Sequence, residues 1–219
     1  MYKSNQLTFY SFGNFFSEVI TSFFTSIAAV LSVVVFYNGV NYDIYGNYKI
    51  FEWVSSGNFI VNWSINIDPL TSVMLVIVSL ISSIIHFYSI GYMHNDPNKP
   101  RFMAYLSLFT FAMLTLVTAD NFLQLYFGWE GVGLCSYFLI GFWYKKQAAN
   151  AAAIKAFIVN RVGDFGFAIG IFLIFFFYGT VNYSEVFQQT PLLVNKEVIL
   201  LFINFILIRL ICLMLFLGA

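Results

Sequence analysis

Long apolar segments alternate with short polar segments along this chain. About 20 consecutive apolar residues in a helix cross the hydrocarbon core of a bilayer. The pattern predicts six spanning helices, at approximately Phe15–Tyr37, Pro69–Gly91, Phe102–Thr118, Asn121–Trp143, Ala151–Tyr178 and Lys196–Gly218. We see no repeat of 20–50 residues and no linker. The expected fold is therefore all-α, a polytopic transmembrane bundle forming one domain over residues 1–219.

A polar insert at 41–68 separates the first two predicted helices. Within it, Tyr48–Trp53 and Phe59–Ile67 alternate apolar and polar residues around a Ser-Ser-Gly-Asn sequence, which predicts a small β-hairpin. Asp68 then has the chemistry of a helix cap, and Pro69 suits the first turn of the next helix.

Composition supports a membrane protein and excludes several other classes. The chain is 60% hydrophobic and 9% charged, with a mean hydropathy of +0.82, whereas soluble domains carry about 25% charged residues. Its net charge of zero and the lack of a basic tail argue against a nucleic-acid partner. Cys135 and Cys212 both lie in apolar segments, outside any Cys/His cluster, so we expect no disulfide, metal site or bound cofactor in this chain.

The loop charges predict an orientation. If the helices alternate in direction, one side receives most of the basic loop residues: Lys3, Lys99, Arg101, Lys145 and Lys146. Basic loops mark the cytoplasm or the mitochondrial matrix, so the N-terminus should be inside and the hairpin outside. The first apolar segment is too long for a cleavable signal, and no arginine precedes Arg101, unlike an imported mitochondrial precursor. The 21% aromatic content suits an organellar gene.

Glu130 is a carboxyl near mid-depth of the fourth predicted helix, roughly 13 Å from its start. A charge there costs at least ~2.5–3.5 kcal/mol, which makes such residues functional candidates. A nearby cation favours the ionised carboxyl, so a movable cation would produce a proton relay. Gly128, Gly131 and Gly133 would allow close helix approach. The alternative is a carboxyl that is protonated or hydrogen-bonded for packing.

The fifth predicted helix carries Lys155, Arg161 and Asp164. Arg161 and Asp164 are three residues apart and should be neighbours, whereas Lys155 lies half a turn from Asp164. Gly166 and Gly170 favour a helix interface on the face of Asp164. We expect Asp164 to be a proton site or counter-charge that Arg161 tunes; the alternatives are a structural ion pair and, for Lys155, an interface anchor.

Two further ionisable residues lie in apolar segments. His86, near the inner end of the second predicted helix, could collect protons from the inner aqueous side, or it could be hydrogen-bonded structurally. Arg209 should be buried in the last helix and would need a partner from elsewhere. We interpret four aromatic residues as packing and membrane-interface residues: Trp129, Tyr137, Phe142 and Trp143.

Four segments carry a family resemblance: HFYSIGYM at 86–93, DNFLQLY at 120–126, GWEGVGLCSYFLIGFWY at 128–144 and KAFIVNRVGD at 155–164. From about Asp68 to Tyr183 the chain resembles chain 5 of mitochondrial NADH–ubiquinone oxidoreductase, the antiporter-like subunit family of complex I. The first 40 residues match only weakly.

The resemblance implies a non-redox subunit of a proton-translocating NADH:ubiquinone reductase. Such subunits resemble Mrp-type antiporters, lie at the distal end of the membrane arm in the mitochondrial inner membrane, and bind no cofactor themselves. NADH, FMN, iron–sulfur clusters and ubiquinone belong to other subunits. Glu130 matches the GWEG glutamate, which in the family pairs with a lysine on a broken seventh helix; Arg161 and Asp164 match the RVGD pair.

Two departures shape the expected function. From the resemblance, we expect this chain to begin at the family's second helix and to end before the GKSAQ-like segment that holds the partner lysine. We therefore expect part of a proton half-channel, completed by a second polypeptide that supplies the lysine, with Arg209 as a weaker substitute.

Expected partners are other membrane-arm subunits, including a neighbouring antiporter-like chain, and lipids such as cardiolipin. The alternatives are a scaffold at the distal tip without transport and a free-standing Na⁺/H⁺ antiporter piece. The lack of a second acid or hydroxyl cluster for a hard cation disfavours the antiporter piece.

Overall fold

The computed structural model describes residues 2–57, 59–194, 196–200 and 203–218. For residues 2–12, 197–200 and 203–205 it describes the backbone alone.

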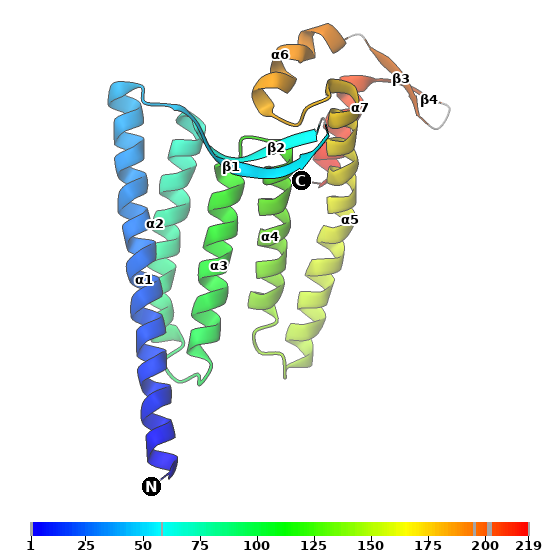
Figure 1. The fold of residues 1–219 in the computed structure, drawn as a ribbon. Coiled ribbons are helices and arrows are strands. Elements are labelled where there is room, and N and C mark those ends of the chain that lie inside the picture. The colour runs from blue at the N-terminus through cyan, green and yellow to red at the C-terminus, as the bar shows by residue number, and fades with distance from the viewer. Residues whose placement is uncertain (1, 58, 195, 201–202, 219) are drawn as a thin grey trace.

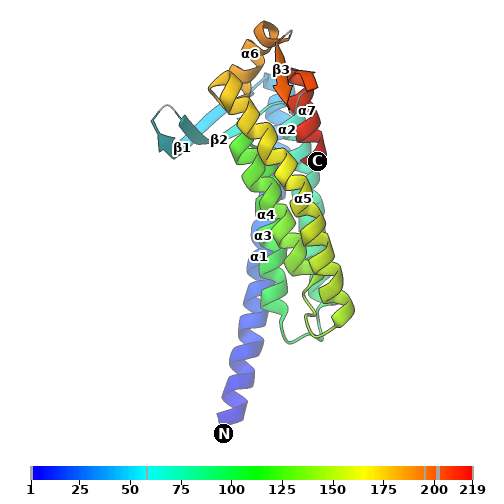
Figure 2. The same cartoon turned by 90° about the vertical axis from the view of Figure 1, so that its right-hand side faces the viewer.

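Five long helices lie side by side and alternate in direction (Figure 1): α1 (Tyr2–Tyr42), α2 (Pro69–Tyr92), α3 (Lys99–Val117), α4 (Phe122–Ile140) and α5 (Gln147–Tyr178). These elements confirm the first five predicted helices, although α1 begins 13 residues earlier than predicted and extends past its neighbours. Helices α1, α2 and α3 pack on one another, α3 also packs on α4 and α4 on α5, and the helices overlap in a narrow band when viewed from the side (Figure 2). Part of α5 is covered by the last helix of the chain.

Four helical segments in the described part of the chain are long and apolar enough to span a membrane: Gly13–Tyr42, Pro69–Tyr92, Lys99–Val117 and Gln147–Tyr178. Helix α4 has the same 19-residue length as α3 and packs between two of these helices. Its sequence is interrupted by Gln124, Glu130 and several glycines. Helices therefore form at five of the six expected spans, which agrees with an all-α transmembrane bundle.

The predicted sixth helix, Lys196–Gly218, is wrong over its first half. The structure has a short helix α6 (Tyr183–Leu193), then antiparallel strands β3 (Glu197–Leu200) and β4 (Ile203–Ile206), and only then α7 (Leu207–Gly218). The apolar run is long enough for a span but is rich in Ile, Val and Phe, which fit a strand as well as a helix. At 12 residues, the described part of α7 is about 18 Å long.

The hairpin prediction is confirmed by the antiparallel strands β1 (Gly46–Ser56) and β2 (Phe59–Ile67). The hairpin lies across the ends of the helices (Figure 1). A buried glutamine at the start of α4 holds it there: the Ser64 N–H donates to Gln124 Oε1 at 3.1 Å, and Gln124 Nε2 donates to the Ser64 carbonyl at 2.8 Å. The predicted cap is also present, because the Thr71 N–H donates to Asp68 Oδ1 at 2.6 Å.

The glycines predicted to allow close packing do so. The Cα of Gly128 faces the backbone of Leu116 in α3 so closely that a Cβ would lie 2.7 Å from the Leu116 Cα. On α5, Gly166 and Gly170 lie against Leu217 and Leu215 of α7. Helix α4 is thereby fixed against α3, and α5 against α7, around the ionisable residues.

Candidate functional site

Glu130 lies in the middle of α4, and both Arg161 and Asp164 lie near the middle of α5. Helix α4 starts at a well-formed cap, where the Gln124 N–H donates to Asn121 Oδ1 at 2.8 Å. The start of α4 lies beside the end of α5. There the Phe122 N–H donates to the carbonyl of Val181, three residues beyond α5, at 3.0 Å. These bonds fix which turns of α4 and α5 face each other.

Arg161 is shared by two carboxylates. Its Nη1 forms an ion pair with Glu130 Oε2 and lies 3.7 Å from Asp164 Oδ2. The side chains of Glu130 and Asp164 are 21% and 7% exposed, whereas that of Arg161 is 48% exposed. With both carboxyls ionised, Arg161, Glu130 and Asp164 together carry a net charge of minus one. One proton bound to either carboxyl makes their net charge zero.

Two aromatic residues of α4 donate to these carboxylates. The Tyr126 hydroxyl donates to Glu130 Oε1 at 2.8 Å, and Trp129 Nε1 donates to Asp164 Oδ1 at 3.0 Å. We call the five residues Tyr126, Trp129, Glu130, Arg161 and Asp164 the acid–arginine cluster. The interpretation of Trp129 as a packing residue is incomplete, since its ring also packs on Phe167 while its N–H holds a carboxylate.

The cation beside Glu130 comes from this chain. The sequence predicts that Glu130 has no direct partner in this chain and pairs with a lysine of another polypeptide, while Arg161 and Asp164 shift its proton balance. The structure corrects this expectation, because α5 approaches α4 closely enough for Arg161 to reach Glu130. The cost of an unpaired buried charge therefore no longer argues for a second chain.

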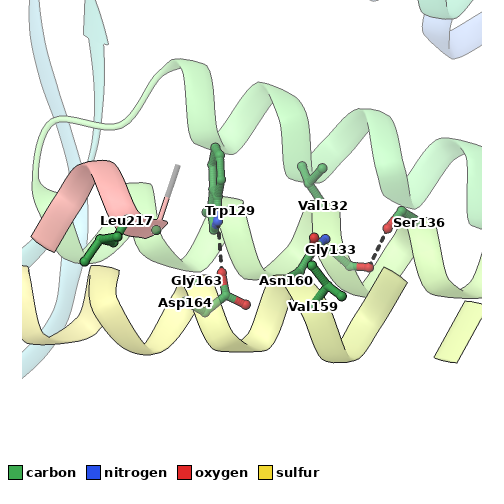
Figure 3. A pocket seen from close by; sticks show the side chains of 10 residues that line it. Trp129, Val132, Gly133, Ser136, Val159, Asn160, Gly163, Asp164 and Leu217 are labelled. Carbon is green, nitrogen blue, oxygen red and sulfur yellow. Dashed lines mark hydrogen bonds between the residues drawn. The ribbon is translucent and has the colours of Figure 1, made fainter. Parts of the chain in front are cut away.

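A cavity of about 360 Å³ opens between α4 and α5 beside Asp164 (Figure 3). Trp129 and Asp164 lie at one end of it, next to Leu217 of α7, and Asn160 and Ser136 lie along it toward the other end of the helices. Asn160 precedes Asp164 by one helical turn. A cavity of this size with several polar groups can hold water that reaches the Asp164 carboxyl.

Lys155 and Arg209 lie outside the cluster. Lys155 is exposed and has no ion-pair partner among the described residues, which favours the interface-anchor interpretation. Arg209 is also exposed in α7, so the expectation that it is buried is wrong.

His86 is fully buried between α2 and α3. Its Nδ1 lies 2.8 Å from the Ser82 carbonyl, which can only accept, so Nδ1 carries the hydrogen. Its Nε2 lies 3.1 Å from the Ser107 hydroxyl, which then donates. Both ring nitrogens of a neutral histidine are satisfied and the side chain has no exposed surface, which favours the structural alternative over proton collection from water.

Sequence analysis missed a second buried ion pair. Lys99 Nζ of α3 lies 3.0 Å from Glu18 Oε1 of α1, and the two side chains are 13% and 9% exposed. Glu18 could have indicated this pair from the sequence, because it is the one acid in the first apolar segment and a buried acid needs a partner. Within the described residues, no three His, Cys, Asp or Glu side chains gather closely enough to hold a metal ion.

Two family models match this chain. Residues 53–103 match the N-terminal part of NADH–ubiquinone oxidoreductase (complex I) chain 5, and residues 119–219 match the transmembrane region of the NADH:quinone oxidoreductase/Mrp antiporter family. Together the two models cover more than half of the chain.

Curated relatives agree with these models. NADH-quinone oxidoreductase subunit L of Rickettsia felis is 51% identical over 204 residues, which are 93% of this chain and 31% of the relative. NADH-ubiquinone oxidoreductase chain 5 of Chondrus crispus is 55% identical over 168 residues, 77% of this chain and 25% of the relative. The chain thus spans about a third or less of the length of these relatives.

A solved structure shares the fold. A chain of the Mrp complex from Dietzia sp. DQ12-45-1b superposes with a TM-score of 0.70 at 21% identity, over 97% of this chain and 23% of that chain. This likeness shows the fold. The two family models and the curated relatives show that the chain belongs to the family of antiporter-like membrane subunits that includes complex I chain 5 and subunit L.

Proposed function

We propose that this chain contributes part of a proton-translocation half-channel to the membrane arm of a proton-pumping NADH:ubiquinone oxidoreductase. The observation that carries the proposal is the sharing of one arginine by two carboxylates midway along α4 and α5. The names of its relatives, which are subunits of NADH-quinone and NADH-ubiquinone oxidoreductases, supply the enzyme context.

The acid–arginine cluster can hold and pass one proton. When Arg161 pairs with Glu130, the guanidinium balances that carboxylate, and the one proton that neutralises the set can lie on Asp164 beside the cavity. A small movement of the guanidinium toward Asp164 exchanges the two roles, so the proton passes from Asp164 to Glu130. Tyr126 and Trp129 keep the two carboxylates in place while the proton moves.

The proposal extends to location and partners. The chain lies in the mitochondrial inner membrane with its N-terminus on the matrix side. Figure 1 shows the α2–α3 and α4–α5 connections at the same end as the N-terminus. Lys99 and Arg101 follow the first connection and Lys145 and Lys146 lie in the second, so the basic residues support this orientation. Its partners are other membrane-arm subunits, including a neighbouring antiporter-like chain and a polypeptide that completes the channel, and lipids such as cardiolipin. NADH, FMN, iron–sulfur clusters and ubiquinone bind to the other subunits.

The test is the proton-to-electron ratio of the assembled complex in sealed vesicles, with NADH and a ubiquinone analogue. Glu130→Gln removes the exchangeable proton with little change in shape, and we expect the ratio to fall while uncoupled electron transfer persists. Glu185→Gln is the matched control, because Glu185 is an acid outside the bundle that accepts from Asn182. An assembled Glu130→Gln complex that pumps at the control ratio refutes the relay and leaves the scaffold at the distal tip.

A further inference from the structure

A second cavity, of about 420 Å³, lies at the end of the bundle where α3 and α5 begin and α4 ends. Polar and aromatic side chains line it, chiefly Arg101, Tyr105, Tyr137, Tyr144 and Asn150. This cavity is separate from the acid–arginine cluster, which lies near the middle of the same helices.

Arg101 has unused hydrogen-bond donors at this cavity. A guanidinium carries five N–H groups. The structure shows one hydrogen bond for them, from Nη2 to the Phe142 carbonyl at 3.1 Å. Its Nε is buried and has no partner among the described residues. The guanidinium lies between two rings, with its carbon 4.7 Å from the centroid of Phe142 and 5.4 Å from that of Tyr144. A planar cation held in this way suits bidentate binding of a phosphate or carboxylate.

The nearest acid does not use these donors. Asp96 Oδ1 accepts the Asn98 N–H at 2.8 Å, and Asp96 Oδ2 accepts Trp143 Nε1 at 3.1 Å. Two further cations, Lys145 and Lys146, lie exposed in the turn between α4 and α5. Asp96 interacts electrostatically with Arg101 but is outnumbered by Arg101, Lys145 and Lys146, so the surroundings of the cavity carry a net positive charge that an anion would balance.

The position of the cavity indicates the source of that anion. The cavity is at the end of the spanning helices, where Trp143 and Tyr144 are exposed as in the aromatic belt of a membrane interface. Ile154 and Phe138 form an apolar side of the same cavity, and the Ile154 side chain is half exposed. A phospholipid offers both parts, a phosphate for Arg101 and apolar chains that continue along Ile154.

We propose that this cavity binds the phosphate of an anionic phospholipid, with Arg101 as the bidentate donor and Lys145 and Lys146 as the source of preference for a negative headgroup. The site does not depend on proton transport by the acid–arginine cluster. It would fix the ends of α3, α4 and α5 at the headgroup level of one leaflet.

The experiment uses the purified complex that contains this chain, stripped of lipid in detergent. Native mass spectrometry counts the molecules bound during titration with phosphatidylglycerol, with phosphatidylcholine and with inorganic phosphate. We expect the wild type to hold one more phosphatidylglycerol than Arg101→Gln at equal lipid concentration, and Arg101→Gln to bind that lipid at least ten-fold more weakly. Lys145→Gln/Lys146→Gln should reduce the preference for phosphatidylglycerol over phosphatidylcholine.

Two further variants separate binding from folding. Ile154→Trp blocks the apolar side of the cavity and keeps every charge, so it should lose the same lipid. Lys49→Gln is the control, because Lys49 is an exposed cation that pairs with Glu52 in the hairpin, and it should bind as the wild type does. The proposal is overturned if Arg101→Gln and Ile154→Trp retain the wild-type lipid count. It is equally overturned if inorganic phosphate, and not lipid, binds in an Arg101-dependent way.

Discussion

Removal of Arg161 should destabilise the protein because it leaves two neighbouring carboxylates without a counter-charge. At the 3.7 Å between Arg161 Nη1 and Asp164 Oδ2, the attraction is about 4–5 kcal/mol at an effective dielectric constant near 20. Breaking a buried pair typically costs ~3–5 kcal/mol. Because the arginine side chain is 48% exposed, we expect Arg161→Met to lower the free energy of unfolding by the lower end, about 3 kcal/mol.

A double-mutant cycle isolates the cause. Glu130→Gln alone should be destabilising, because it leaves Arg161 with one ion-pair partner in place of two. In the Arg161→Met background the same change should be stabilising by at least ~1 kcal/mol, because it removes one of the two unpaired carboxylates. The measurement is equilibrium unfolding of the full chain in detergent micelles.

Lys155→Met is the matched control for this cycle. Lys155 is an exposed cation on the same helix without an ion-pair partner among the described residues, so its removal should change stability by less than about 0.5 kcal/mol. If Arg161→Met behaves like Lys155→Met, or if Glu130→Gln has the same sign in both backgrounds, the arginine does not balance the carboxylates and the argument for the relay is lost.

Three other predictions concern the rest of the bundle. Gly128→Ala should cost about 2–3 kcal/mol of unfolding free energy, because its Cβ would lie 2.7 Å from the backbone of α3; Gly13→Ala, with nothing within 4 Å, should cost nothing. Glu18→Leu should cost about 3 kcal/mol by leaving Lys99 buried without its partner, and adding Lys99→Met should recover most of that loss in the same assay. A backbone N–H two residues further on holds the pKa of the Asp96 carboxyl below its ordinary value. The stabilisation of the α2–α3 turn is therefore complete above about pH 4 and lost as pH falls through the folded pKa; hydrogen exchange in the turn should show this, and Asp96→Asn should abolish it.

Hydropathy and turn chemistry predicted most of the helical row. A backbone in lipid must satisfy its own hydrogen bonds, so a long apolar run such as Pro69–Tyr92 can only be a helix. The same argument predicted one helix after Lys196, and this prediction was wrong because half of the apolar segment forms strands β3 and β4. Length and apolar composition are the same for both outcomes, and only tertiary contacts distinguish them.

The sequence predicted which ionisable residues form the candidate site, but it did not predict which of them form ion pairs across helices. Glu130, Arg161 and Asp164 stand out because each is a charge in an apolar helix, and the i,i+3 spacing gives the Arg161–Asp164 contact. The Glu130–Arg161 pair joins residues 31 positions apart, and the Glu18–Lys99 pair joins α1 to α3, which are not consecutive in the chain. Spacing on one helix cannot supply such contacts, which depend on how deeply the glycines let neighbouring helices approach.

The fastening of α4 to α5 at both ends has a consequence for how any signal could pass between them. At one end the Phe122 N–H donates to the Val181 carbonyl and the Tyr183 N–H to the Asp120 carbonyl, and at the other end a six-residue connection, 141–146, joins the helices. Sliding of one helix along the other would break the two backbone hydrogen bonds and strain the short connection. Rotamer changes of the side chains between the helices need neither, so they are the motion of lowest cost in this pair.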